Sequence, residues 1–212
     1  MASREYEALE DALVSAGVPT DWSRDANGAV VGGQGPVAVL VNTRLSARPY
    51  VQLLLDALPK LSGMELEMVV RALSERGMPG VAPVLASMMA DAGASTSVGW
   101  ALGNALATIR DPATFETIVR LAADRRLGAD RQMLFSLLPR IGTPAAFDVA
   151  MRALDDDSVR GHALEALGRF GRLDAVEPIR QLVTRPGLYE HKAKATALRR
   201  LERLRLAAPD AT

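Results

Sequence analysis

Four stretches of the chain repeat one pattern of apolar and polar positions. They are RALSERGMPGVAPVL, NALATIRDPATFETIV, SLLPRIGTPAAFDVA and EALGRFGRLDAVEPI, and a final half-unit follows in TALRRL. Aligning them puts one small or apolar position in register, at Ala72, Ala105, Leu137, Ala166 and Ala197, with steps of 33, 32, 29 and 31 residues. A period of this length is typical of a two-helix unit, so the pattern predicts a stacked array of helical hairpins.

Turn residues recur at fixed places within these units. Glycine stands five residues after the register position, at Gly77, Gly142 and Gly171, with Arg110 in the remaining unit. Proline stands two residues further on, at Pro79, Pro112 and Pro144, with Leu173 in the remaining unit. Glycine ends a helix by adopting the left-handed conformation, and proline fits the first turn of the next helix. Each unit is therefore predicted to be a helix, a tight turn and a second helix.

The segment VRGHALEALGRFGRLDAVEPIRQLV resembles HEAT or HEAT-like repeats of the phycobilin-lyase type. The longer string from GWALGNALA through DRRLGADRQML to GHALEALG is similar to a bacterial group of small HEAT-repeat proteins. The resemblance covers about residues 63–207. It implies an all-α fold, a right-handed α-α superhelix (HEAT-like solenoid) of about five helical-hairpin units. This fold serves mainly as a binding scaffold, so the resemblance says more about structure than about activity.

The pattern predicts the following division of the chain. Residues 63–207 hold the repeats, with paired helices at about 64–76 and 80–91, 96–110 and 112–124, 130–141 and 144–154, 158–170 and 173–184, and a terminal helix at about 188–207. Residues 1–62 are an N-terminal helical unit, with helices near 3–16 and 47–59 and a long linker at 17–46. Within this linker, VVGGQGPVAVLVN is a candidate short hairpin. Ser62 and Glu65 have the spacing of a capping box, and 208–212 is expected to be a disordered tail.

Composition narrows the classes of function. The 25 basic and 25 acidic residues give a formal net charge of zero, so no overall field draws the chain to nucleic acid or to an anionic membrane. The chain has no cysteine, which excludes disulfides, thiolate nucleophiles and cysteine zinc sites. Its start, MASREYEALEDALVSAGVP, is unlike a secretory signal, and the apolar run PVAVLV is too short to span a bilayer. We therefore expect a cytoplasmic protein without membrane contact, metal or cofactor.

The stretch DDDSVRGHALEALGRFG places three carboxylates close to a histidine and so raises the question of an acid–base or metal site. His162 occupies a register position at which the sister units have Met68, Ala101, Met133 and Ala193. This favours a structural histidine on or beside the packed face of its helix. Asp155, Asp156 and Asp157 fall at the start of the same helix, where the helix dipole stabilises negative charge. We expect no catalytic residue here.

Trp100 and two rows of charge are the first candidate binding residues. The sister units have mostly polar residues at the position of Trp100, so this tryptophan is either an exposed contact residue or packed on an adjacent helix or the linker. The second helices carry acids at Glu116, Asp148 and Glu177, and four residues further on they carry Arg120, Arg152 and Gln181. The resemblance implies that second helices line the concave face, so these ladders would point into a groove. The alternative is a solvated face stabilised by pairs four residues apart.

The loop DRRLGADR is a further candidate. It places Arg125, Arg126 and Arg131 between two units, where they could receive a carboxylate or phosphate. The alternative is a solvated loop.

These features favour a non-catalytic scaffold that binds a protein or peptide in a concave groove. Nucleic-acid binding, as in the DNA alkylation-repeat proteins that share such helices, is the first alternative; the zero net charge and the few aromatic residues argue against it. The second alternative is an accessory of an enzyme, of lyase or chaperone type. The leucine stripe of ALRRLERLRLAA suits a capping helix and would also suit a contact between two copies of the chain.

Overall fold

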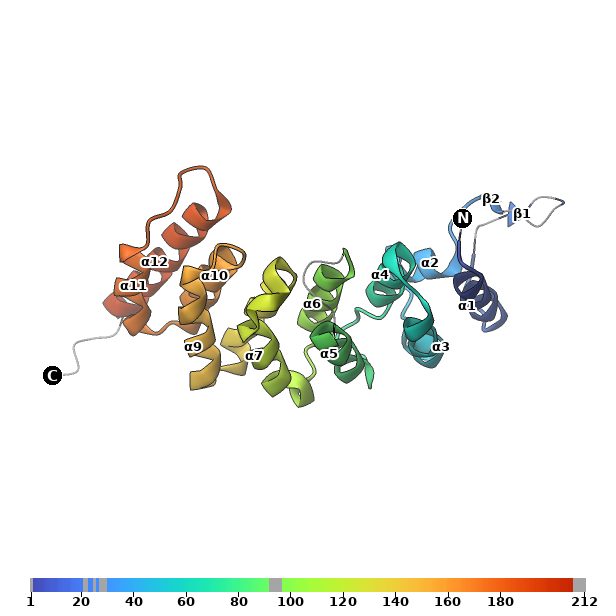
Figure 1. Cartoon of the computed structure of the whole chain (residues 1–212), viewed down its shortest axis with the longest axis horizontal. Helices are drawn as coiled ribbons and strands as arrows, with labels where there is room; N and C mark the ends of the chain where they lie inside the picture. Colours follow the sequence, from blue (N-terminus) through green and yellow to red (C-terminus); the bar gives the residue numbers. More distant parts are fainter. Residues whose placement is uncertain (1, 21–22, 25, 27–29, 92–96, 208–212) are drawn as a thin grey trace.

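A computed structural model describes residues 2–20, 23–24, 26, 30–91 and 97–207, and within them the repeats form a row of helical hairpins in two layers (Figure 1). The first helices of the hairpins lie in one layer: α4 (Gly63–Ala72), α6 (Ser97–Ile109), the 3-10 segment η4 (Arg125–Ser136) with α8 (Leu138–Ile141), α10 (Arg160–Phe170) and α12 (Tyr189–Ala207). The second helices lie in the other: α5 (Val81–Asp91), α7 (Phe115–Ala123), α9 (Pro144–Arg152) and α11 (Val176–Gln181). The predicted all-α solenoid is confirmed.

Helix ends follow the turn residues of the repeat. Gly142 and Gly171 cap α8 and α10 in the left-handed conformation, both with φ of 70°. Arg110, which replaces glycine in its unit, adopts the same conformation with φ of 59°. Pro144 begins α9 behind the cap residue Thr143, whose hydroxyl accepts from the Ala146 N–H at 3.2 Å. The turn position is therefore set by the geometry of the hairpin, and a non-glycine residue there must adopt a strained backbone.

The N-terminal unit differs from its prediction. Its elements are α1 (Arg4–Ser15), β1 (Ser23–Arg24), β2 (Val30–Gly32), α2 (Pro36–Asn42), η1 (Arg48–Tyr50), α3 (Val51–Ala57) and η2 (Leu58–Lys60). The long linker predicted at 17–46 contains a helix that the pattern did not predict, because α2 lies inside it and buries Pro36, Val37 and Leu40. The antiparallel strand pair is formed by β1 and β2, so only VVG of the candidate hairpin stretch is a strand, and PVAVLVN is helical. The predicted tail at 208–212 lies outside the described residues.

The predicted capping box before α4 is also replaced by a longer-range contact. Ser62 makes no side-chain cap bond, and Glu65 instead accepts from the N–H of Ser3 at 2.7 Å and from its hydroxyl at 2.6 Å. Ser3 in turn caps α1 by accepting from the Tyr6 N–H. Glu65 thus ties the start of the chain to the first helix of the repeats.

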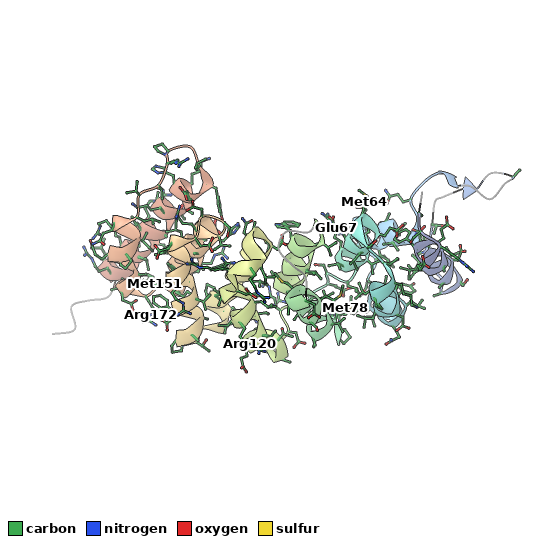
Figure 2. The ribbon with its side chains drawn as sticks, in the orientation of Figure 1. Met64, Glu67, Met78, Arg120, Met151 and Arg172 are labelled. Carbon is green, nitrogen blue, oxygen red and sulfur yellow. The ribbon has the colours of Figure 1, made fainter. Side chains whose placement is uncertain are left out.

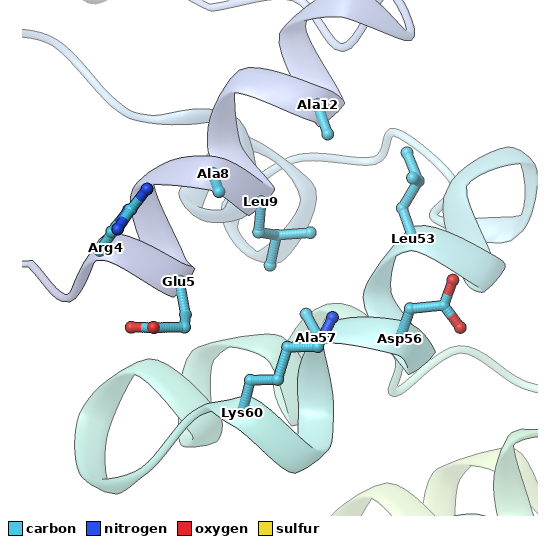
Figure 3. Close-up of a pocket in the computed structure, with 9 residues that line it drawn as sticks. All are labelled: Arg4, Glu5, Ala8, Leu9, Ala12, Leu53, Asp56, Ala57 and Lys60. Carbon is cyan, nitrogen blue, oxygen red and sulfur yellow. The ribbon is translucent and has the colours of Figure 1, made fainter.

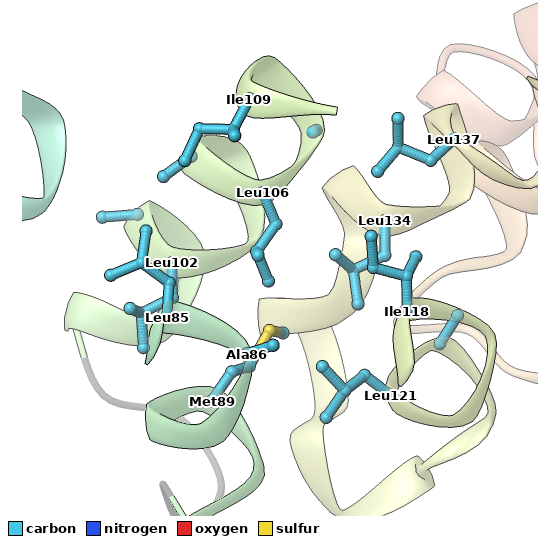
Figure 4. Packing of buried hydrophobic residues seen from close by; sticks show 14 of the residues in the cluster. Leu85, Ala86, Met89, Leu102, Leu106, Ile109, Ile118, Leu121, Leu134 and Leu137 are labelled. Carbon is cyan, nitrogen blue, oxygen red and sulfur yellow. The ribbon is translucent and has the colours of Figure 1, made fainter. Parts of the chain in front are cut away.

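One continuous core runs between the two layers. Figure 4 shows its middle, where Leu102, Leu106 and Ile109 of α6 meet Leu85 and Met89 of α5 on one side. On the other side they face Ile118 and Leu121 of α7, and Leu134 of η4. Because every hairpin shares apolar side chains with the next one, each unit is stabilised by its neighbours rather than by a core of its own.

Candidate functional site: an arginine-lined cavity between α7 and α9

A cavity of about 80 Å³ lies where the second repeat unit (α6 and α7) meets the third (η4, α8 and α9). Its walls come from the end of α7, from η4 and from the end of α9 with the residue after it: Ala122, Ala123, Arg125, Arg131, Val149, Arg152 and Ala153. These seven residues include three arginines and no acid. The structure therefore brings together three of the residues that the sequence had suggested separately, two from the loop and one from the ladder.

The path of the chain at η4 explains this convergence. Asp124 ends α7 and caps η4 by accepting from the Arg126 N–H at 3.0 Å. Gly128 then breaks the helical path with φ of 49° and ψ of −128°. The predicted regular helix at 130–141 is thus replaced by 3-10 turns and the short α8, and this path turns Arg131 inward.

Arg131 is the most unusual residue of the site, because only 2% of its side chain is exposed. Its Nη1 donates to the carbonyl of Ala122 at 2.7 Å, and its Nη2 is paired with the carboxylate of Asp156. The guanidinium also lies 5.9 Å from the centre of the Phe135 ring. Arg131 is therefore not part of a solvated loop, and the carboxylate that it receives is that of Asp156 from within the chain. Its side chain joins α7, η4 and the turn before α10.

Asp156 is the counter-ion that the sequence reasoning had assigned only to a helix dipole. Its Oδ1 accepts from the N–H of Ser158 at 3.0 Å and from its hydroxyl at 2.6 Å. Although partial burial disfavours the charged form, these bonds and the charge of Arg131 hold the pKa of Asp156 below its usual value. Arg125, which is largely exposed, lies 3.9 Å from the same carboxylate.

Arg126 does not belong to the cavity. It is exposed and pairs with Asp124 at 2.6 Å, and this carboxylate raises the pKa of the Arg126 guanidinium. Of the three arginines on the predicted basic loop, the structure thus places two at the cavity and one in a local ion pair on the surface.

The other residues of the aspartate–histidine stretch have structural contacts. Arg160 is paired with Asp157 and, at 3.1 Å, with Glu190 at the start of α12, and its Nε donates to the carbonyl of Leu154 at 2.8 Å. His162 is partly buried, its ring centre lies 5.1 Å from that of Tyr189, and burial lowers its pKa. Its place beside the packed face is as predicted. Among the described residues no group of three or more His, Cys, Asp or Glu side chains is arranged to hold a metal ion.

The ladder residues lie on the second helices, as predicted, and all six are exposed: Glu116, Arg120, Asp148, Arg152, Glu177 and Gln181. Figure 2 shows Arg120 on the outer side of α7. Within the described residues, however, no ion pair joins Glu116 to Arg120 or Asp148 to Arg152. Arg120 donates instead to the Thr117 hydroxyl at 3.0 Å. In α11, Glu177 accepts from Gln181 at 3.0 Å and pairs with Arg180 at 2.9 Å.

Trp100 is exposed to 42% on α6. Of the two alternatives left open by the sequence, partial exposure favours a surface residue. Trp100 belongs to the layer of first helices, whereas the ladders belong to the layer of second helices. A single groove formed by one layer therefore does not hold both.

Close helix approaches at glycine are a feature that the sequence reasoning missed. A Cβ on Gly103 would lie 2.6 Å from the carbonyl oxygen of Asp130, and one on Gly99 would overlap the side chain of the same aspartate. In α10, a Cβ on Gly168 would lie 2.9 Å from the Cα of Ala197. The available signal was the presence of glycine inside otherwise regular helical patterns, which often marks close backbone contact.

A second cavity lies in the N-terminal unit between α1 and α3, with a volume of about 360 Å³ (Figure 3). Its floor is apolar, with Leu9 and Leu53, and its rim carries two cations and two carboxylates: Arg4, Lys60, Glu5 and Asp56. Because the rim has no dominant charge, it indicates no class of ligand.

Comparison with known families identifies one segment. Residues 159–184, which span α10 and α11, match the family model described as PBS lyase HEAT-like repeat. No curated protein matches the chain. In the described residues no helix is both long and apolar enough to cross a membrane. The match covers one repeat, α10 with α11, and the other hairpins of the row have the same two-helix arrangement.

Proposed function

We propose that this protein is a non-catalytic scaffold that binds another protein or a peptide through the face formed by its second helices. HEAT-like repeats generally mediate such interactions. The observation that carries the proposal is that the charged side chains of the ladder are exposed and are not paired along their own helices. Glu116, Arg120, Asp148 and Arg152 are exposed on two successive helices, and within the described residues neither acid is paired with the arginine four residues away on its own helix. These charges are accessible to a partner.

Recognition would then depend on charge complementarity rather than on a deep apolar pocket. Acid and base alternate along the row, so a partner with the opposite alternation would be attracted in one register and repelled in the shifted ones. Arg172 is a further cation beside this row (Figure 2). Its position is restrained because the carbon of its guanidinium lies 3.8 Å from the centre of the Phe147 ring of α9. Trp100, on the other layer, would be a separate contact and not the anchor of this groove.

The test compares two double charge reversals. Arg120→Glu with Arg152→Glu changes the ladder, and Arg140→Glu with Arg205→Glu makes the same change of net charge at exposed positions on first helices. With the native partner recovered by affinity pull-down from the source cells, we expect the ladder variant to weaken binding at least tenfold and the control to bind as wild type. Equal binding by both variants would show that the ladder is not part of the interface.

An accessory role at an enzyme is compatible with the same scaffold, and the matched repeat carries the name of a lyase. Nucleic-acid binding has no comparable support, because acids alternate with arginines along the exposed row. A visible absorbance band in the purified protein would favour the accessory role. A complex with duplex or single-stranded DNA in a low-salt mobility shift would favour the second alternative.

A further inference from the structure

The starting point is an incomplete set of hydrogen bonds at Arg131. A guanidinium has five N–H donors, and buried polar groups are almost always satisfied. In Arg131 the two terminal nitrogens donate to Ala122 and Asp156, whereas the buried Nε has no hydrogen-bond partner among the described residues. An unsatisfied donor on a buried charge is costly, so its persistence beside a cavity suggests that a further acceptor belongs there.

The charge balance around the cavity points the same way. Arg125, Arg131 and Arg152 all line it, and Asp156 is the carboxylate paired with Arg131. Asp156 is itself shared with Ser158 and lies 3.9 Å from Arg125. Asp124, which directly precedes Arg125, is paired with Arg126. Three guanidiniums thus line a small space, and the carboxylates that act on Arg131 are the directly paired Asp156 and the more weakly acting Asp124.

Burial acts against this positive charge. Burial lowers the pKa of Arg131, the carboxylates of Asp156 and Asp124 oppose that shift, and the nearby Arg125 adds to it. Arginine nevertheless stays protonated in proteins, so the site keeps its charge and gains from an anion.

The size and walls of the cavity limit the ligand. A water molecule occupies about 30 Å³ in the liquid, so 80 Å³ has room for the equivalent of two or three waters. The remaining walls, Ala122, Ala123, Val149 and Ala153, offer no side-chain hydrogen-bonding group and leave space for a compact ligand. Planar guanidiniums match carboxylate and phosphate oxygens in geometry as well as in charge.

We propose that this cavity binds a single phosphate-sized oxyanion, with Arg125, Arg131 and Arg152 as its ligands. The oxyanion is either free inorganic phosphate or a phosphate or carboxylate group carried by a peptide. The site does not depend on the ladder interface proposed above, although Arg152 belongs to both. Arg131 has two roles in it: its terminal nitrogens join neighbouring units, and its Nε faces the anion.

The first experiment measures thermal unfolding of the whole chain in sodium phosphate and in sodium chloride at equal ionic strength. We expect phosphate to raise Tm in a saturable manner, since a ligand that binds the folded state stabilises it by mass action. Arg152→Gln should weaken the apparent phosphate affinity at least tenfold. The matched control is Arg140→Gln on α8, an exposed arginine that neither lines the cavity nor belongs to the ladder and should respond as wild type.

The second experiment distinguishes the sources of the oxyanion. Short peptides with a central phosphoserine, glutamate or alanine are titrated by calorimetry, together with inorganic phosphate. Binding of phosphate alone would assign the site to the free ion, and binding of the phosphoserine or glutamate peptide but not the alanine peptide would assign it to a carried group. The proposal is overturned if neither phosphate nor any acidic peptide binds, or if Arg152→Gln and Arg140→Gln respond alike. Arg125→Gln gives an independent check, because Arg125 is largely exposed and its loss is compatible with folding.

Discussion

The third repeat unit (η4, α8 and α9) and the fourth repeat unit (α10 and α11) pack against their neighbours in different ways. In the fourth unit, α10 is a regular helix that approaches α12 closely because Gly161 and Gly168 have no side chain there. In the third unit, the corresponding segment is the broken η4, and a buried arginine ion-paired to the next unit lies at its centre. The segment that matches the repeat family is the regular one, residues 159–184.

This difference suggests that irregularity in a repeat array marks a specialised position. A regular unit is stabilised by apolar and small-residue contacts, which are insensitive to ligands. The irregular unit contains a charged group with an unmet hydrogen bond, and such groups are stable only when the surrounding structure compensates them. The cavity lies at the irregular unit, and the comparison can be tested from both sides.

The largest expected effect on stability comes from removing Arg131, the buried charge of the third unit. Arg131→Met should lower the free energy of unfolding by about 3 kcal/mol, because Asp156 loses its buried cation and the Ala122 carbonyl loses a donor. Urea unfolding followed by circular dichroism measures this. Arg126→Met is the control, since its exposed ion pair with Asp124 should leave the midpoint unchanged. If Arg131→Met is as stable as wild type, the third unit does not depend on its buried arginine.

A smaller effect is expected from the fourth unit. Gly168→Ala places a Cβ 2.9 Å from the Cα of Ala197, and α10 and α12 must move apart to accept it. Overpacking of this kind costs about 1–3 kcal/mol, and the better helix propensity of alanine offsets about 1 kcal/mol of that. We expect a net loss near 1 kcal/mol in urea unfolding. Arg169→Ala, at the next and exposed position, should lose less, and the reverse order would contradict the close approach.

The smallest effect concerns His162 and pH. Burial lowers its pKa in the folded chain below the unfolded value of 6.5, so folding favours the neutral ring. The stabilisation is present above pH 6.5 and is lost as pH falls through the lower, folded pKa. His162→Met, which copies the residue of two sister units, should remove this component. We expect the wild type to lose more stability than the variant between pH 7.5 and pH 5, measured by urea midpoints; parallel losses would mean that His162 is effectively solvated.

Much of the fold could be predicted from the sequence because its signals are local. Gly142 and Gly171 end helices through their own backbone preference, and Thr143 with Pro144 begins one through a single cap bond. Ile118 and Leu121 follow the apolar period of α7. Helix α2 was missed because seven residues behind a glycine-rich stretch look like loop or strand until their burial against the repeats is known.

The site was predicted less well, since it depends on distant pairs. Nothing local to Arg131 shows that it turns inward, because its counter-ion Asp156 lies 25 residues away in the next unit. Arg125 and Arg126 are neighbours in one charged run, yet one lies at the cavity and the other in a surface ion pair. The ladder could be placed on exposed helix faces from its period, whereas the absence of its pairs four residues apart, within the described residues, depends on rotamers and alternative partners such as Thr117.

The sequence by itself determined the repeat, the position of most turns and the exposed ladder, because helix periodicity and capping act over a few residues. Only the tertiary structure decided which charges are paired across units, which helices approach through glycine and where three arginines share a cavity. Those outcomes depend on how neighbouring hairpins pack, and packing brings together residues that no local pattern connects.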